Sequence, residues 1–241
     1  CWNICHHGND SDYSDCESDS DDEIAEINTN ALYLVMRNYD NMDIELLKMI
    51  LGRLKYIDDV YEDSKFIGAF KCLICQKKYE ACDLILSKNP SFVNIYNKNC
   101  TILSFMIVFK AKILVEKYLF VSTTNLLLEA HKKEKYTYLH VLIDGCDFDN
   151  AKKYIEKYPK SAKSISIDKR TIIEHIILCL EKLDSDNECV DMIKFLVKYG
   201  CNVNNINVHK MPSIFVAIQY GTVKIVETLL NSKVKLMSNK K

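Results

Sequence analysis

Residues 192–204 read MIKFLVKYGCNVN, and residues 212–230 read PSIFVAIQYGTVKIVETLL. In the first stretch the apolar residues recur at helical spacing and stop at Gly200, a residue type that commonly ends a helix. In the second stretch two apolar segments flank Gly221, and the later one carries Leu229-Leu230. Both stretches thus carry apolar segments interrupted by a single Gly.

The two stretches resemble ankyrin repeats. In that family the second helix ends in leucines, and the sequence continues through Gly and a small residue to Asp-Val-Asn. The segment Gly200–Asn204 matches that ending except that Asn replaces Asp. Ala217 and Ile218 stand for the paired small residues near the start of the next repeat.

More copies occur upstream, and their openings keep a regular phase. Thr137-Tyr138-Leu139-His140 matches the family's Thr-Pro-Leu-His opening except at Pro. Openings are expected near residues 30, 68, 101, 137, 171 and 212, close to the family period of about 33 residues. Pro90 and Pro159 each lie 22 residues past an opening. A proline at that place follows the second helix without disturbing it.

The resemblance therefore predicts an all-α fold, an ankyrin-repeat solenoid of about six helix-turn-helix repeats with short finger loops, over residues 30–236. Strands are expected only as short finger hairpins. Each repeat is too small to bury its own apolar face, so neighbouring repeats must stack into one continuous core. An unrelated helical domain would explain the leucines but not the phased Thr, Pro and Gly.

Charge is divided unevenly along the 241 residues. The net charge is −1, yet residues 1–28 contain nine acids and no Lys or Arg. The rest of the chain contains the other 24 of the 33 acids and all 32 Lys and Arg, so it carries about +8. A block of one sign is typical of a disordered interaction tail, which we predict for residues 1–28.

Four serines in this tail have acids one to three residues downstream and resemble sites of acid-directed kinases: Ser11, Ser14, Ser18 and Ser20. Repeats behind an acidic tail resemble the cytoplasmic inhibitors of Rel-type transcription factors. Those proteins carry a DSGxxS signal, whereas Asp10-Ser11-Asp12 lacks the Gly. The repeats, rich in Ile, Asn and Lys, are also similar to those of large DNA viruses.

Motifs of catalysis and cofactor binding are missing. The sequence contains no GxxxxGK[ST], GxGxxG, GxSxG or HExxH. We therefore expect no enzyme, no catalytic residues, no cofactor and no small-molecule substrate. The apolar runs stay below the roughly 18 residues of a membrane-spanning helix. Nucleic acid is not an expected partner either, because no recognition module occurs. The expected state is a monomer in the cytoplasm, also in the nucleus, or in the host cytoplasm if the chain is viral.

The cysteines and histidines do not predict a metal site. Cys1, Cys5, His6, His7 and Cys16 provide enough ligands for one zinc ion, but their spacing matches no familiar motif. Cys72 and Cys75 form a lone CxxC inside an expected helix. Most cysteines lie in apolar sequence and are predicted to act as small hydrophobes, among them Cys72, Cys75, Cys82, Cys146 and Cys179. His140 and His175 are expected to have structural roles.

What the resemblance implies is a non-catalytic protein–protein interaction module that binds a partner on its fingers and concave face. The charged finger positions, called the basic ridge below, are Lys132, Lys133, Lys135, Lys160, Lys163, Lys169, Arg170, His209 and Lys210. A basic ridge favours an acidic partner, and we expect the acidic tail to compete for it. Two alternatives are an inhibitor of Rel-type transcription factors, cellular or viral, and the substrate-binding part of a ubiquitin-ligase adaptor.

Asn94 and Asn204 resemble the asparagines that ankyrin-directed hydroxylases modify. Each follows a Val directly and a Leu at eight residues' distance, although Phe92 and Asn202 replace the usual acid. Hydroxylation at both positions is a prediction from this pattern. The alternative is an Asn that only holds the finger turn.

Overall fold

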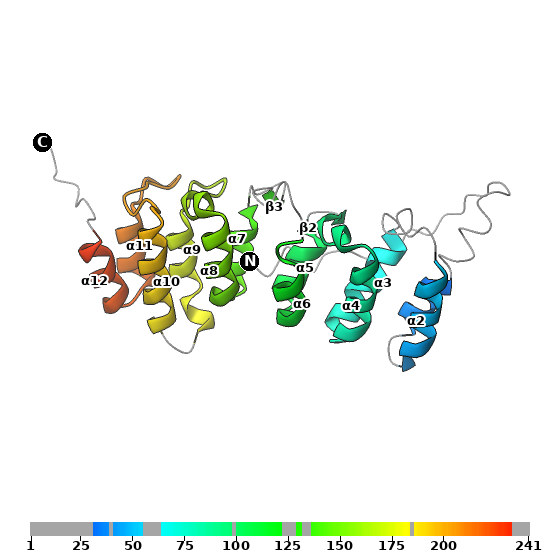
Figure 1. Cartoon of the computed structure of the whole chain (residues 1–241). Helices are drawn as coiled ribbons and strands as arrows, with labels where there is room; N and C mark the ends of the chain where they lie inside the picture. The colour runs from blue at the N-terminus through cyan, green and yellow to red at the C-terminus, as the bar shows by residue number, and fades with distance from the viewer. Residues whose placement is uncertain are drawn as a thin grey trace, which may run out of the picture.

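The computed structural model describes residues 31–38, 41–54, 64–97, 100–121, 129–131, 136–183 and 186–232. Over these residues the chain forms six successive helix pairs stacked side by side (Figure 1). The first helices of the pairs are residues 31–37, α3 (Ser64–Cys75), α5 (Ile102–Val108), α7 (Tyr138–Asp144), α9 (Ile172–Leu178) and α11 (Ser213–Tyr220). The second helices are α2 (Ile44–Arg53), α4 (Tyr79–Lys88), α6 (Lys112–Tyr118), α8 (Phe148–Lys157), α10 (Asp186–Lys198) and α12 (Val223–Asn231).

Within the described ranges, strands occur only as two antiparallel hairpins. One joins β1 (Tyr96–Asn97) to β2 (Cys100–Thr101), and the other joins β3 (Glu129–His131) to β4 (Tyr136–Thr137). Both lie at finger positions between helix pairs. Short 3-10 helices make up η4 (Pro90–Asn94), η5 (Pro159–Lys163) and η6 (Leu180–Lys182). The prediction of an all-α solenoid with short finger hairpins is confirmed.

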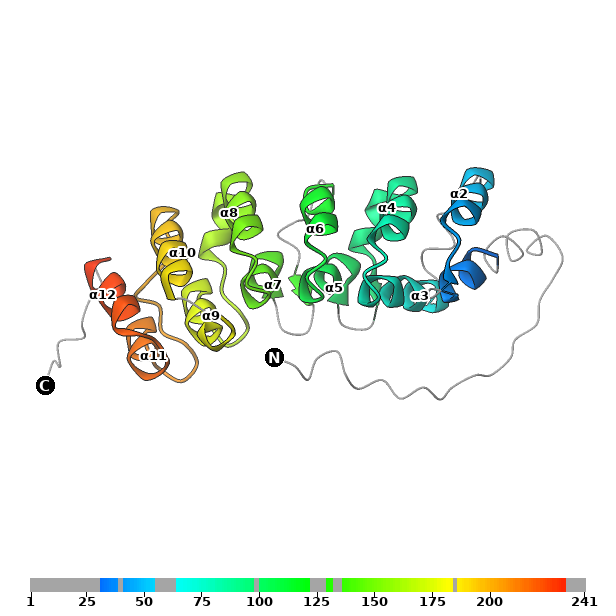
Figure 2. The same cartoon turned by 90° about the horizontal axis from the view of Figure 1, so that it is seen from below.

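The helices lie in two rows, which Figure 2 shows from below. The second helices form the outer row of a shallow arc: α4, α6, α8, α10 and α12. The first helices line its inner side: α3, α5, α7, α9 and α11. The fingers stand along the upper edge in Figure 1. This arrangement gives the molecule three kinds of surface: an outer helical face, an inner helical face and a row of fingers.

Threonines at the expected openings begin three of the inner helices. Thr101 Oγ1 accepts the backbone N–H of Ser104 at 3.1 Å, and Thr171 Oγ1 accepts that of Glu174 at 3.3 Å. A Thr at this place satisfies an N–H that the helix itself leaves unpaired. Where Gly68 offers no side-chain oxygen, α3 begins four residues earlier, at Ser64. The expected opening near residue 68 therefore falls inside a helix.

The core runs along the whole stack because equivalent residues of successive inner helices are buried. Leu103, Leu139 and Ile173 are all fully buried, and so are Ile143 and its equivalents in the flanking repeats. Cutting such a side chain back to Ala costs about 2–5 kcal/mol in a well-packed core. The apolar periodicity of the sequence is thus the main source of the solenoid's stability.

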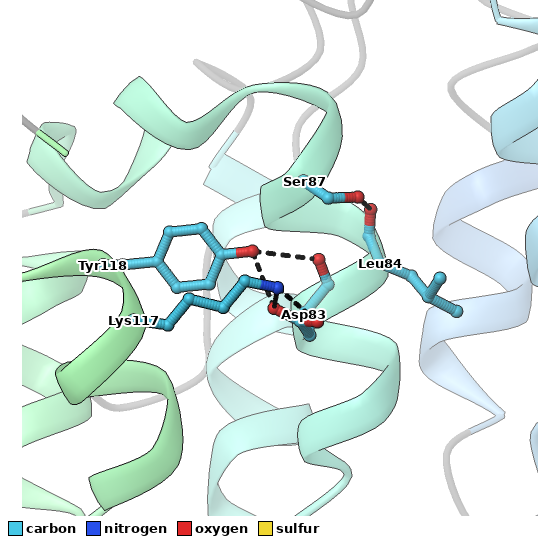
Figure 3. Close-up of polar contacts among 5 residues, drawn as sticks. All are labelled: Asp83, Leu84, Ser87, Lys117 and Tyr118. Atoms are coloured by element: carbon cyan, nitrogen blue, oxygen red, sulfur yellow. Dashed lines mark hydrogen bonds and ion pairs between the residues drawn. The ribbon is translucent and has the colours of Figure 1, made fainter.

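The outer helices are tied to one another by polar side chains. Lys117 Nζ on α6 lies 2.6 Å and 2.7 Å from the two carboxylate oxygens of Asp83 on α4 (Figure 3). The hydroxyl of Tyr118 donates to the same carboxylate at 2.7 Å. Burial opposes ionisation of Asp83, but these hydrogen bonds prevail and hold its pKa below the usual value. Asp83 therefore joins two repeats as an ionised acceptor.

The same kind of contact recurs along the outer row. Lys153 on α8 pairs with Glu116 on α6 at 2.5 Å, and Lys224 on α12 pairs with Asp186 on α10 at 3.3 Å. The hydroxyl of Thr222 also donates to Asp186, at 2.8 Å. Each contact joins neighbouring repeats, so outer-face lysines take part in holding the stack together.

The inner helices hold buried titratable groups. His140 is fully buried, and its Nδ1 accepts the backbone N–H of Thr137 at 3.1 Å. Nδ1 of His175 lies 3.4 Å from a carboxylate oxygen of Asp144 in the preceding repeat. Burial, followed by the charge of His175, lowers the pKa of His140 to about 3. Both histidines thus have the structural environment expected of them.

The expected burial of the cysteines is only partly correct. Cys82 and Cys179 are buried, whereas Cys146 is half-buried and both Cys72 and Cys75 are exposed. In α3 the core face is formed by residues such as Phe70, Leu73 and Ile74. The two cysteines point elsewhere, because helical geometry places them on the other side of the helix.

Candidate partner-binding surface

Two consecutive fingers, residues 164–171 and 205–212, have the same backbone structure. In each, a residue near the start bridges to the residue before the next helix, Ile165 to Thr171 and Ile206 to Pro212. Lys169 and Lys210 occupy the same turn position with φ of 56° and 57°. A positive φ is unfavourable for a side chain such as Lys, so a defined turn holds both residues in this conformation.

Main-chain atoms connect the two fingers. The N–H of Val208 donates to the carbonyl of Asp168 at 3.1 Å, and the side-chain amide of Asn205 donates to the carbonyl of Lys169 at 2.6 Å. Asn207 is buried beneath the second finger, where its side-chain oxygen accepts two backbone N–H groups, those of His209 and Met211. The fingers are therefore fixed in position relative to each other.

The outward-facing side chains of these fingers are apolar. Ile165, Ile167, Ile206 and Val208 are 48%, 51%, 42% and 47% exposed. Ser166 and Asn207, which alternate with them, are buried. The predicted surface did not include these four residues because it rested on charge, although the alternation Ile-Ser-Ile and Ile-Asn-Val is visible in the sequence. Exposed apolar side chains gathered on neighbouring loops are typical of interaction sites.

Six members of the basic ridge lie beside these apolar tips. Lys160 and Lys163 belong to η5, and the other four belong to the two fingers: Lys169, Arg170, His209 and Lys210. All are exposed except Arg170, which is half-buried. None forms an ion pair with the part of the chain that the structure describes. Lys132, Lys133 and Lys135 lie outside the described residues.

Repeat stacking brings the ridge lysines to the base of the fingers. A Cβ added to Gly200, at the end of α10, would lie 3.0 Å from Cε of Lys163. The stem of Lys163 therefore rests on the following repeat, immediately before the second finger begins. Lysines that sequence analysis assigned to separate segments thus share the surface between the fourth and sixth repeats.

Of the two hydroxylation candidates, Asn94 ends η4 and Asn204 directly precedes the second finger, and both are half-buried. The side-chain amide of Asn94 donates to the carbonyl of Ser91 at 3.3 Å. The backbone N–H of Asn204 donates to the side chain of Asn202 at 3.0 Å. Hydroxylation at both stays a prediction. Ser11, Ser14, Ser18, Ser20 and the cluster Cys1–Cys16 fall outside the described residues.

Among the described residues, no group of three or more His, Cys, Asp or Glu side chains is placed to hold a metal ion. No helix within the described ranges is long and apolar enough to cross a membrane. Burial raises the pKa of the Cys82 and Cys201 thiols to about 12, so these groups stay protonated.

Comparison with known proteins agrees with this geometry. No family model and no curated protein matches the sequence. Among solved structures, an ankyrin repeat domain from Acinetobacter baumannii AYE is similar with a TM-score of 0.67 and 16% identity, over 85% of this chain and 98% of that one. The ankyrin repeat domain of Bcl-3, a member of the IkappaB protein family, gives 0.57 and 13%, over 85% and 86%.

A third similar chain comes from the structure of a predatory endopeptidase from Bdellovibrio bacteriovorus in complex with an immunity protein. Its TM-score is 0.63 at 16% identity, over 84% of this chain and 98% of that chain. At sequence identities this low, the similarity to these structures shows a shared fold. Stacked helix pairs with fingers define a helical repeat solenoid. More particularly, the chain has the ankyrin-repeat fold.

Proposed function

We propose that this protein is a non-catalytic interaction scaffold, acting in the cytoplasm, that binds an acidic partner protein through the fingers of repeats four to six. The observation that carries this proposal is the row of exposed apolar tips, Ile165, Ile167, Ile206 and Val208. Cations without ion-pair partners stand beside them. Apolar centres supply most of the affinity in protein interfaces, and surrounding charges select the partner.

The test is affinity capture with three forms of the full chain as bait. The finger variant carries Ile167→Asp and Val208→Asp. The matched control carries Ile113→Asp and Val223→Asp, which change apolar residues that are even more exposed, on the outer helices α6 and α12. We expect wild type and control to retain the same proteins and the finger variant to lose them. Equal capture by all three baits would contradict the proposal.

Acidity of the partner is tested separately by charge reversal. Lys169→Glu with Lys210→Glu should weaken capture, whereas Lys194→Glu on the exposed side of α10 should not. Capture should also weaken at about 1 M salt, where the Debye length is only ~3 Å. If neither salt nor charge reversal has an effect, the partner is recognised through the apolar tips alone.

The proposal includes the absence of catalysis. The group of residues that most resembles a catalytic site is buried between two inner helices. Cys179 Sγ lies 3.6 Å from a carboxylate oxygen of Asp144, which His175 also contacts. These residue types resemble a catalytic triad. However, Cys179 and His175 are buried, and burial raises the pKa of the Cys179 thiol to about 12. Nucleophilic cysteines have lowered pKa values instead. Labelling of native Cys179 by iodoacetamide at neutral pH would contradict this interpretation.

The Rel-inhibitor alternative has one observation in its favour, the similarity in fold to the Bcl-3 domain. Its test is direct binding of the full chain to a purified Rel-type dimer, with the finger variant as control. The ubiquitin-ligase adaptor stays a prediction from the sequence. Co-purification of a ligase core with the full chain would support it.

A further inference from the structure

A hollow of about 160 Å³ lies between α9 and α11, at the foot of the two fingers. Glu174 and Asn207 contribute to its lining, together with the apolar side chains of Leu178, Val216 and Tyr220. A cavity of about 150 Å³ accommodates a benzene molecule, so this volume fits one large side chain. Leu178 and Tyr220 are exposed, and the hollow is therefore reachable from the inner face of the arc.

The polar group of the hollow is the carboxylate of Glu174. The residue is fully buried, and the hydroxyl of Ser213 donates to its Oε1 at 2.8 Å. Its other oxygen, Oε2, has no hydrogen-bond partner among the described residues. Burial raises the pKa of Glu174, and the side chains of Ser213 and Asn207 and the charges of His175 and Arg170 oppose that rise. Arg170 acts from beyond ion-pair distance. A buried carboxylate with an unused acceptor is costly, so a donor brought by a ligand would be strongly favoured.

The neighbouring repeat shows that this arrangement is not required by the fold. His140 occupies the position equivalent to Glu174, three residues after the opening Thr. Its Nδ1 accepts the backbone N–H of Thr137, so it completes a helix cap inside its own repeat. Glu174 instead accepts a hydrogen bond from Ser213 on the next inner helix, and its Oε2 accepts none.

The mouth of the hollow carries positive charge. The charge is that of Arg170, which lines the hollow beside the imidazole of His209 and forms no ion pair with the described part of the chain. A ligand that carried only a cation would be repelled at the entrance while being attracted by the carboxylate. A ligand with a cation and an adjoining acid would fit both groups. Its cation could pair with Glu174 inside the hollow, and its acid could pair with the guanidinium of Arg170 at the mouth.

We propose that the hollow between α9 and α11 binds a Lys or Arg side chain of the partner protein, in a segment where an acidic residue adjoins it. The charged end donates to Glu174 Oε2, the stem lies against Leu178, Val216 and Tyr220, and the adjoining acid pairs with Arg170. Long basic side chains commonly bury their stems along apolar surface in this way. This inference rests on the proposed function, since it names the anchor by which the partner would be held.

The experiment titrates blocked pentapeptides of sequence Gly-Glu-Arg-Glu-Gly into the full chain and follows the NMR methyl signals of Leu178, Met211 and Val216. A second peptide contains citrulline, which keeps the shape of Arg without its charge. We expect saturable shifts with the Arg peptide and binding weaker by about tenfold or more with citrulline, the loss typical of a charged hydrogen bond.

Glu174→Gln should reduce affinity for the Arg peptide by about the same factor, because it removes the charge and keeps the side-chain size. The control Glu188→Gln, on the exposed side of α10, should leave affinity unchanged. Unshifted methyl signals of the peptide-free variant would show that Glu174→Gln preserves the hollow, and Tyr220→Ala serves as a second variant if it does not. Equal binding of Arg and citrulline peptides, or no methyl shifts at all, would overturn the inference. Finger-dependent capture would still stand in that case, so the two proposals fail separately.

Discussion

The outer helices and the fingers use the same residue type in opposite ways. On the outer face, Lys117, Lys153 and Lys224 each pair with an acid of the neighbouring repeat. On the fingers, Lys169 and Lys210 have no such partner in the described chain. These three outer lysines therefore satisfy their charge within the molecule, whereas Lys169 and Lys210 do not pair with an acid of the described chain. Net charge alone would not distinguish the two surfaces.

The largest expected effect is a loss of folding stability in acid. It comes from neither of the two surfaces but from the buried titratable groups of the inner helices between them. His140 has a pKa of about 3 in the folded chain against 6.5 when free. Protonation therefore favours the unfolded state, and stability is complete above pH 6.5 and falls as the pH drops toward 3. We expect a loss of about 2–3 kcal/mol between pH 7 and pH 4 by urea unfolding.

His140→Gln should flatten this decline, since Gln can accept the N–H of Thr137 and does not titrate. Asp144, whose pKa is lowered by His175 against the effect of burial, adds a further loss only below its usual value near 3.8. An unchanged pH dependence in the variant would show that other groups control acid stability.

The next prediction sharpens the comparison by removing one charge from each surface. Asp83→Ala should destabilise the chain by about 1–2 kcal/mol, because the buried Tyr118 keeps only its longer hydrogen bond, 3.2 Å, to the carbonyl of residue 83 and Lys117 loses its acceptor. Lys169→Ala should change stability by no more than about 0.5 kcal/mol, since it has no partner to lose. Both values come from chemical denaturation. Similar losses from the two variants would mean that the finger lysine is tied into the fold after all.

A third prediction uses the same backbone conformation at two places. Lys110 lies at the turn between α5 and α6 with φ of 56°, as Lys169 does on its finger. Gly adopts this conformation without strain, so Lys110→Gly and Lys169→Gly should each raise stability by about 0.5–1 kcal/mol. Only Lys169→Gly should also weaken partner capture. Weaker capture with Lys110→Gly would extend the binding surface beyond the fingers.

The smallest expected effect concerns a single exposed ion pair. A double-mutant cycle on Glu116 and Lys153 should give a weak coupling that declines with added salt, because solvent screens an exposed pair. The matched cycle on Glu116 and Lys210, which lie on different surfaces, should give none. Coupling that persists at high salt would indicate a contact other than charge.

Much of the fold was predictable because its signals are local. Thr101 and Thr171 begin helices at the places where the sequence predicted openings, and Pro159 begins a 3-10 segment after α8. The start of α3 was not predictable from Gly68, which gives no capping signal. The exposure of Cys72 depends on which face of α3 packs against its neighbours, and apolar composition alone does not determine that.

The candidate binding surface was predictable only in part. Lys169 and Lys210 could be found because charge is visible in a sequence. The hollow at Glu174 could not, since it needs Ser213, 39 residues further along, to turn the carboxylate away from its own helix. Contacts between repeats depend on how the repeats stack, and the sequence pattern fixes that stacking only approximately.

The main-chain bond from Val208 to Asp168 has a consequence for how such a protein evolves. Because the bond uses backbone atoms, the distance between the fingertips does not depend on which side chains the tips carry. Ile167 and Val208 can be exchanged for other residues over generations while the framework that displays them keeps its shape. A lineage could therefore change its partner by substitutions at the tips alone, without first acquiring compensating changes in the core.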